Sequence, residues 1–279
     1  MKTQRVIGLA LVAIVLAALL LGGLLIPLRP TADARPEAYA AALARGEDLF
    51  RRGDFDGAIC AFTDAIRIRP GDAQAYDLRG AAERRKGEPD KAIADCTEAV
   101  RLDPKYSDPY ETRGWAYEDK GDLKRAIDDY TAAIKIERRA TYYCFRGSAY
   151  TRKGELDSAI ADYTQAVRIW PDDAGAYWGR GTALEKKDEL DKAIADFSES
   201  LRLEPENAIA HFSRALAWCR KGEYDKAIAD FSEGIRLRPN DGQAFYYRGI
   251  AYQNMGDTGK AKADFARASK LRYTPAKNE

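Results

Sequence analysis

Residues 226–237 read KAIADFSEGIRL, and residues 260–271, which lie 34 positions further along the chain, read KAKADFARASKL. The two segments share Lys-Ala, then Ala-Asp-Phe, and a final Leu. The alanine in the second position recurs at steps of 34 residues, with one step of 33, at Ala58, Ala92, Ala126, Ala159, Ala193, Ala227 and Ala261. A fixed period of this length indicates one structural unit copied seven times.

The spacing of apolar residues predicts two helices in each copy. In the third copy, Tyr110 and Tyr117 lie seven positions apart, and Ala126 and Tyr130 lie four apart, which are helical intervals. A Lys-Gly pair followed by Asp or Glu is typical of a helix end and a turn, and a proline that ends five copies stops the second helix. The chain is therefore predicted to be all-α.

Two charged positions recur as regularly as the alanine. An Arg-Gly pair lies in the first half of six copies, and an aspartate lies in the second half at Asp95, Asp129, Asp162, Asp196, Asp230 and Asp264. Paired carboxylates for acid–base catalysis would not need six equivalents. We expect a structural role, in which each arginine pairs with an aspartate of a neighbouring copy.

This pattern resembles the tetratricopeptide repeat over about residues 39–272, since both have a 34-residue period with Gly-Tyr, Ala, Phe and Pro at corresponding places. The resemblance implies a right-handed α-solenoid of seven helix-turn-helix repeats, whose first helices line a concave surface. It implies binding of other proteins and no enzymatic activity. The seven copies are assigned to residues 39–72, 73–106, 107–139, 140–173, 174–207, 208–241 and 242–275.

Copy three ends one residue short and without proline, at residues 137–140. A kink or a changed twist is expected between copies three and four. In copy seven, Lys262 and Ser269 replace large aliphatic residues that the other copies carry on one side of the second helix. A terminal copy of a solenoid must present a polar face, so these two residues are interpreted as an end cap.

Residues 6–28 contain no charge, and 15 of the 23 are Leu, Ile or Val. A helix over this segment is long enough to cross a bilayer, since about 20 apolar residues suffice. Residues 1–28 are therefore predicted to be a transmembrane anchor, followed by a linker at 29–38. A cleaved signal peptide is the alternative, because Lys2 and Arg5 precede the segment and Ala32-Asp33-Ala34 fits a cleavage site.

The topology of this anchor is less strongly specified. Lys2 and Arg5 precede the span, whereas Arg29, Arg35 and Arg45 follow it, so the positive-inside count is nearly balanced. The short basic tail favours an N-terminus in the cytoplasm. We expect a single-pass membrane protein with its repeats on the extracytoplasmic side, or a secreted or periplasmic protein if the segment is cleaved.

The composition excludes several classes of function. The chain has 45 basic and 44 acidic residues, without the basic excess that nucleic-acid binding requires. A single histidine, His211, rules out a multi-histidine metal site, and no phosphate-binding glycine motif is present, so we expect no cofactor and no metal. The four cysteines lie at four different repeat positions and are expected to be small buried residues.

The concave face is the candidate site. By the resemblance, its early copies carry charges and its late copies carry large apolar residues. An apolar patch with a basic rim suits an extended peptide or a partner helix. The predicted groove residues are Trp115, Trp178, Phe212, Leu216, Tyr246, Ile250 and Arg220.

We therefore expect a membrane-tethered scaffold or adaptor that binds a peptide or helix of a partner protein in its groove. The alternative is a structural subunit of a membrane-associated assembly, which would oligomerise through its convex surface or its membrane helix. Groove substitutions distinguish the two, because they should abolish partner binding only in the first case.

Overall fold

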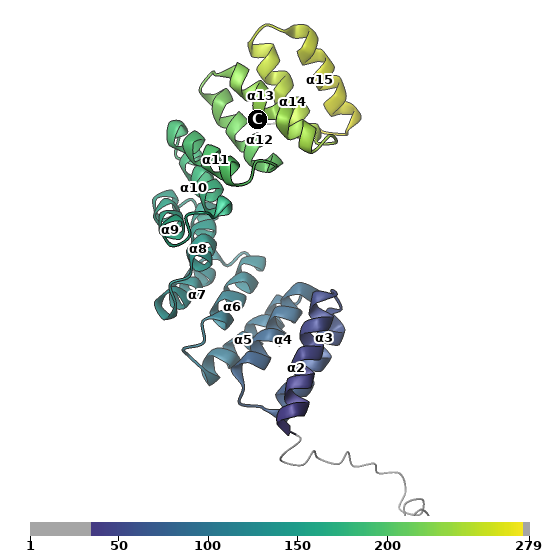
Figure 1. The fold of residues 1–279 in the computed structure, drawn as a ribbon, viewed down its shortest axis with the longest axis vertical. Coiled ribbons are helices and arrows are strands. Elements are labelled where there is room, and N and C mark those ends of the chain that lie inside the picture. Colours follow the sequence, from purple (N-terminus) through teal and green to yellow (C-terminus); the bar gives the residue numbers. More distant parts are fainter. Residues whose placement is uncertain (1–34, 276–279) are drawn as a thin grey trace, which may run out of the picture.

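A computed structural model describes residues 35–275, which form fourteen helices and no strand (Figure 1). The helices are α2 (Arg35–Arg51), α3 (Phe55–Ile68), α4 (Ala73–Lys86), α5 (Pro89–Leu102), α6 (Asp108–Asp119), α7 (Leu123–Ile136), α8 (Ala140–Lys153), α9 (Leu156–Ile169), α10 (Ala174–Lys186), α11 (Leu190–Leu203), α12 (Ala208–Arg220), α13 (Tyr224–Leu237), α14 (Gly242–Asn254) and α15 (Thr258–Lys270). The predicted all-α solenoid of seven helix pairs is confirmed.

The N-terminal prediction lies mostly outside the described residues. The membrane segment expected at residues 6–28 lies entirely outside the described residues. Between residues 35 and 275, no helix combines the length and the hydrophobicity that a membrane span requires. Helix α2 begins at Arg35, within the segment that the sequence assigned to the linker. Pro36 is compatible with that start, because a first helical turn needs no backbone N–H from proline.

In most copies, a glycine followed by an acidic residue forms the turn between the two helices of the hairpin. The glycine has a positive φ in six copies, between 77° and 90°, and Asp188 takes this place in copy five with φ 66°. Only glycine adopts this conformation freely, and aspartate is among the few residues that tolerate it. The following acid caps the second helix in several copies; the Asp122 carboxylate, for example, accepts a hydrogen bond from the Arg125 N–H.

Within a copy, the two helices approach closely because a small residue of the first faces a large residue of the second. A Cβ added to Gly114 would lie 2.6 Å from the Tyr130 ring, and one added to Gly181 would lie 2.8 Å from the Phe197 ring. Tyr130 and Phe197 are fully buried. The glycine of the Arg-Gly pair is therefore required by packing.

The curvature of the solenoid follows from which helices touch. Consecutive first helices contact one another directly, as α4 does with α6 and α10 does with α12. The second helices contact mainly the first helices on either side of them. The first helices therefore lie on the inner, concave side of the array, as the repeat pattern implied.

The junction between copies three and four differs from the others. Helices α6 and α8 approach each other less closely than the other consecutive first helices do. The rings of Trp115 and Phe145 fill the space between them, edge to face, with centroids 4.9 Å apart. This is the step of 33 residues, where the sequence predicted a change in geometry.

The recurring arginine pairs with the aspartate of its own copy, so the predicted pairing with a neighbouring copy was wrong. Arg146 donates two hydrogen bonds of 2.7 Å to the Asp162 carboxylate, across the helix hairpin. Its remaining Nη1 reaches the preceding copy, where it donates to the Thr131 hydroxyl at 2.9 Å. That hydroxyl in turn donates to the Ile127 carbonyl at 2.7 Å. One guanidinium thus ties three helices together.

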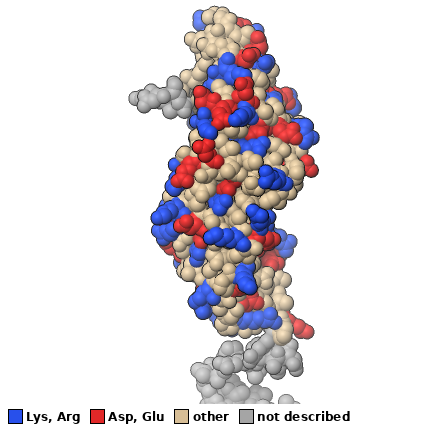
Figure 2. All heavy atoms as spheres, turned by 90° about the vertical axis from the view of Figure 1, so that its left-hand side faces the viewer, with Lys and Arg blue, Asp and Glu red and all other residues tan. Residues whose placement is uncertain are grey.

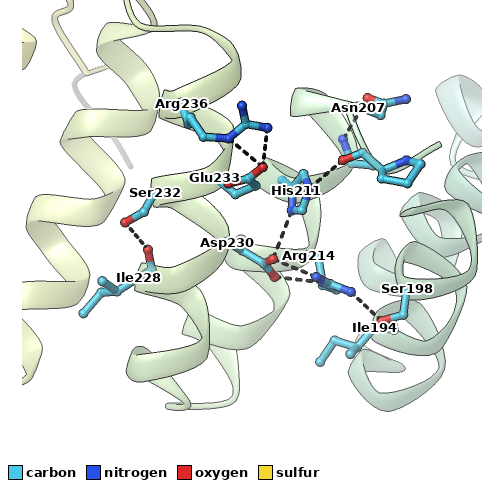
Figure 3. A network of polar contacts seen from close by, with 12 residues as sticks. Ile194, Ser198, Asn207, His211, Arg214, Ile228, Asp230, Ser232, Glu233 and Arg236 are labelled. Carbon is cyan, nitrogen blue, oxygen red and sulfur yellow. Dashed lines mark hydrogen bonds and ion pairs between the residues drawn. The ribbon is translucent and has the colours of Figure 1, made fainter. Parts of the chain in front are cut away.

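We call this arrangement the arginine ladder. It recurs in six copies, through Arg79 with Asp95 and Thr63, Arg113 with Asp129 and Thr97, Arg146 with Asp162 and Thr131, Arg180 with Asp196 and Thr164, Arg214 with Asp230 and Ser198, and Arg248 with Asp264 and Ser232. Figure 3 shows the rung of copy six. All six aspartates are buried, so their charge is compensated inside the array.

His211 is part of this rung. Its Nδ1 lies 3.1 Å from an Asp230 carboxylate oxygen, and its Nε2 lies 3.0 Å from the Pro205 carbonyl oxygen (Figure 3). Both partners are acceptors, so the ring links the ladder aspartate to the loop that precedes α12. Burial alone would raise the pKa of Asp230, but Arg214 and His211 outweigh burial and hold that pKa below its usual range.

Two smaller predictions concern exposed and buried positions. Lys262 and Ser269 are both exposed on α15, which therefore has the polar outer face expected of an end cap. Cys96 is buried and takes the place of the aromatic residue in copy two, whereas Cys60 is exposed, against the expectation for cysteine. Cys60 lies on the solvent side of α3, so its thiol does not serve packing.

The ladder predicts a large difference between two aspartates of the same helix. Asp162→Ala leaves the Arg146 guanidinium buried without its carboxylate, which should cost about 3 kcal/mol of unfolding free energy. Asp157, whose side chain is 85% exposed, pairs with Lys187 at the surface. Asp157→Ala should cost about 0.5 kcal/mol, as expected for exposed ion pairs. Urea unfolding followed by circular dichroism measures both, and equal losses would contradict a structural role for the ladder.

Candidate functional site

The predicted apolar groove residues of the late copies lie on three consecutive first helices. Trp178 is on α10, Phe212 and Leu216 are on α12, and Tyr246 and Ile250 are on α14. All five side chains are half-buried. Each one therefore has part of its surface packed against neighbouring side chains and part open to solvent.

Contacts between neighbouring copies fix the orientation of Trp178 and Phe212. The Trp178 indole N–H donates to the Ser213 hydroxyl at 3.1 Å, which links α10 to α12. The Phe212 ring meets Phe231 and Tyr247 edge-on, with centroids 5.5 and 5.7 Å away. Such aromatic contacts hold large side chains in one rotamer. The apolar surface that faces the groove is thus already ordered.

Tyr246 continues the same row toward the C-terminal end of the described chain. Its ring lies 5.5 Å from Tyr247, 5.6 Å from Phe265 and 5.3 Å from Tyr273. Because Tyr247 also contacts Phe212, the two predicted groove residues belong to one connected set of rings. We call the surface formed by Trp178, Phe212, Leu216, Tyr246 and Ile250 the aromatic groove.

Trp115 lies apart from the aromatic groove. It belongs to α6, on the other side of the junction with α8, where it packs against Phe145. The Arg84 guanidinium lies 5.1 Å from the centroid of the Trp115 ring, a cation–π distance. Trp115 therefore helps to close the junction between copies three and four, in addition to facing the concave side.

Arg220, predicted as a basic rim residue, already has acidic partners. It donates to the Glu185 backbone carbonyl at 2.8 Å and to the Asp188 carboxylate at 2.6 Å, both in the preceding copy. Arg152 pairs with Glu118 of its preceding copy in the same way. The rim is therefore a row of ion pairs between copies. Sequence reasoning missed it because the partners are about one repeat apart and meet only after stacking.

The early copies carry carboxyl groups, Asp77 and Glu111, at the repeat position that the late copies fill with aromatic residues. Asp77 is 6% exposed and accepts a hydrogen bond from the Tyr106 hydroxyl at 3.2 Å. Its other oxygen, Oδ1, has no hydrogen-bond partner among the described residues. Burial raises the pKa of Asp77 to about 6. Burial, together with the charges of Asp108 and Asp77, raises the pKa of Glu111 to about 7.

The described residues carry charges of both signs and no metal-binding cluster. Positive and negative side chains are interspersed over the face drawn in Figure 2, so no single-sign field spans it. Within residues 35–275, no group of three or more His, Cys, Asp or Glu side chains is placed to hold a metal ion. His211, the one histidine, is engaged in the ladder.

These features define an α-solenoid of helix hairpins whose late first helices carry a row of half-buried aromatic side chains. Family models described as tetratricopeptide repeats match residues 28–73, 43–107 and 179–242 in one case, and residues 107–139 and 243–271 in two others. A further model, described as a TPR repeat, matches residues 147–188. The chain belongs to the tetratricopeptide repeat family, whose members typically serve as scaffolds that bind other proteins.

Solved structures of other repeat proteins share the fold. The MamA protein is 29% identical over 62% of this chain and 95% of its own, with a TM-score of 0.53. A tetratricopeptide repeat protein from Parabacteroides merdae is 20% identical over 85% and 94% of the two chains, with a TM-score of 0.64. YrrB is 23% identical over 67% and 97%, with a TM-score of 0.57. No curated protein matches the sequence.

The raised pKa of Asp77 predicts a pH-dependent stability. A carboxyl whose pKa rises on folding stabilises the folded chain fully below its unfolded pKa, near 4, and this contribution is lost as the pH rises through about 6. In the Asp77→Asn variant, the side chain at position 77 cannot ionise. The difference in unfolding free energy between Asp77→Asn and the wild type should therefore grow with pH, by about 3 kcal/mol between pH 4 and 8.

Urea titrations at several pH values measure this difference. Glu111→Gln should show the same direction, with its change centred nearer pH 7. A difference that is constant from pH 4 to 8 would show that Asp77 is not held in a desolvating environment.

Proposed function

We propose that this chain is a membrane-tethered scaffold whose aromatic groove binds an extended peptide or a helix of a partner protein. The observation that carries the proposal is the row of ordered, half-buried aromatic side chains on three consecutive first helices. Aromatic residues held in one rotamer lose little entropy on binding and dominate the energy of protein interfaces. The proposal assigns no catalytic activity to the chain.

The spacing of the helices sets the size of the partner segment. Neighbouring packed helices lie about 8–10 Å apart, so three first helices span roughly 20 Å. An extended peptide advances about 3.3 Å per residue and would cover this distance with about six residues. A peptide of this length, with apolar side chains at alternate positions, would contact Trp178, Phe212 and Tyr246 in turn.

The charged residues of the rim are already paired with one another, so the partner would be held mainly by apolar contacts. Arg220 is held by Asp188 and Glu185, so the groove offers no uncompensated arginine there for a terminal carboxylate. YrrB, which shares the fold, is described as having an unusual peptide-binding site. That description supports the idea that an array of this fold can bind a short peptide. The preference for an apolar peptide is inferred from the side chains of this chain alone.

The tether is the second part of the proposal. The uncharged segment at residues 6–28 would hold the repeats beside a bilayer as a single-pass anchor, with the repeats on the extracytoplasmic side. A tethered groove meets partners of the same membrane at a raised effective concentration. An assembly subunit that oligomerises without using the groove is the competing function, and the groove variants below separate the two.

Photocrosslinking tests the groove. A photoreactive amino acid replaces Leu216 in the full-length protein, which leaves the aromatic row intact, and a matched control replaces the exposed Ser158 on α9, a second helix. We expect one discrete protein adduct from position 216 and none from position 158. Trp178→Ala and Tyr246→Ala should each lower the yield of this adduct at least tenfold, because an interface residue of this kind contributes about 2 kcal/mol to binding.

Two outcomes of this experiment would contradict groove binding. One is an adduct whose yield is unchanged in both alanine variants. The other is self-crosslinking from position 158 with none from position 216, which would favour the assembly function. Circular dichroism of each variant controls for loss of the fold.

Membrane extraction tests the tether. We expect the full-length protein to stay with membranes at high pH, because about 20 apolar residues insert effectively irreversibly. Removal of residues 1–28 should release the repeats. Recovery of the wild type in the aqueous fraction, with a mass that shows cleavage after the apolar segment, would support a signal peptide instead.

A further inference from the structure

One edge of the solenoid carries most of its exposed large apolar side chains. This inter-repeat edge consists of the loops between copies and of the helix ends that adjoin them. Within residues 35–275 five large apolar side chains are exposed, and four of them lie on this edge: Ile136, Ile169, Trp170 and Ile209. Trp170 is the most exposed of them, at 53%. Isolated apolar residues are common on surfaces, but their concentration on one edge calls for a partner surface.

Trp170 interrupts a row of charged residues. The equivalent position in every other copy is charged, at Arg69, Asp103, Glu137, Glu204, Arg238 and Arg272. Ile169 precedes Trp170 and is 45% exposed, while Ile136 occupies the same repeat position as Ile169 in copy three. Copy four therefore carries an exposed indole where the other copies have a charge, and Ile136 and Ile169 are exposed beside it in copies three and four.

The same two copies carry basic residues without ion-pair partners. The last turn of the second helix has a basic residue in every copy, and in copies one, two, five and six an acid three positions earlier pairs with it. Copies three and four have Ala132 and Gln165 at the acid position, and the terminal copy seven has Arg267 there. Lys135 and Arg168 are exposed and form no ion pair with the described residues.

The neighbouring charges add to this positive surface. Arg138 is exposed, and its Nε donates to the neutral Tyr143 hydroxyl at 3.3 Å. Of the acids on this edge, Glu137 pairs with Arg139 at 2.6 Å, and the Asp173 carboxylate caps α10. Asp172 lies near enough to Arg202 for their charges to interact. The edge of copies three and four thus combines exposed apolar side chains with three basic side chains, Lys135, Arg138 and Arg168, that form no ion pair with the described residues.

The chain enters the array from this edge. The Arg69 guanidinium, one residue beyond the end of α3, lies 4.2 Å from the centroid of the Tyr39 ring in the first turns of α2. The start of α2 is therefore beside the end of α3, on the inter-repeat edge. Residues 29–34 connect Arg35 to the apolar segment at 6–28, and six residues span at most about 20 Å.

We propose that the inter-repeat edge of copies three and four lies on an anionic membrane surface. Trp170 and Ile169 insert among the lipid head groups, where tryptophan is favoured, and Lys135, Arg138 and Arg168 face the lipid phosphates. The proposal rests on the membrane tether, which delivers this edge to the bilayer, and it applies on whichever side of the membrane the facing leaflet carries anionic lipid. A membrane on this edge contacts helix ends, so it leaves the aromatic groove, which runs along the flanks of the first helices, open to a partner.

Fluorescence quenching by brominated lipids tests the contact. The full-length protein is reconstituted into phosphatidylcholine vesicles that contain roughly one-third phosphatidylserine, as in an anionic leaflet, with or without brominated acyl chains. Bromine quenches tryptophan only at close range. Of the four tryptophans, Trp170 is exposed, whereas Trp115, Trp178 and Trp218 are half-buried. Brominated vesicles should quench the wild type, and Trp170→Phe should lose most of that quenching.

Two double variants test whether the basic residues of the edge contribute to membrane contact. Lys135→Gln combined with Arg168→Gln should lower the quenching in anionic vesicles several-fold. The matched control, Arg101→Gln combined with Arg236→Gln, removes two arginines that Glu98 and Glu233 already neutralise, and should leave the quenching unchanged.

Vesicle flotation, scored in parallel, separates the two proposals. Protein that floats but is quenched equally with and without Trp170 overturns the edge contact alone and leaves this edge as a docking surface for a protein. Protein that does not float overturns the tether and the edge contact together. Flotation with quenching that depends on Trp170 and on the two basic residues supports both.

Discussion

Each rung of the arginine ladder joins two helices of one copy to the helix of the copy before it. The guanidinium can do this because it offers a planar fork to the carboxylate and a further N–H to a hydroxyl. The same contact sets the pairing within the hairpin and the stacking between hairpins. A buried arginine needs all its partners, so the hairpin and the stack must form together. The regular curvature of the array, with first helices inside, follows from repeating this one contact.

The array is least regular at the junction of copies three and four. At the junction of α6 and α8 the first helices separate, and Trp115 and Phe145 fill the gap. This divides the concave face into an early part with buried carboxyl groups such as Asp77 and a late part with the aromatic groove. A partner segment can therefore meet two chemically different surfaces on one continuous scaffold.

The sequence predicted the helix pairs well because local signals specify them. The period placed the helices, and glycines such as Gly121 marked their ends. The partner of each arginine could not be read from spacing: Asp129 is 16 residues after Arg113 and Asp95 is 18 before it, and only hairpin geometry selects Asp129. Groove positions followed from the family resemblance. The ion pairs of Arg220 could not be predicted from the sequence, because they form between copies.

Copy one departs from the ladder in a way that bears on mechanics. Ala61 stands where the other six copies have the ladder aspartate, sixteen residues after Arg45. The hairpin of α2 and α3 is therefore held by apolar contacts, such as those of Phe62, without the internal ion pair. A pull applied from a tether would reach this hairpin first. Because this hairpin lacks the internal ion pair, we expect it to open at a lower force than a hairpin that has one.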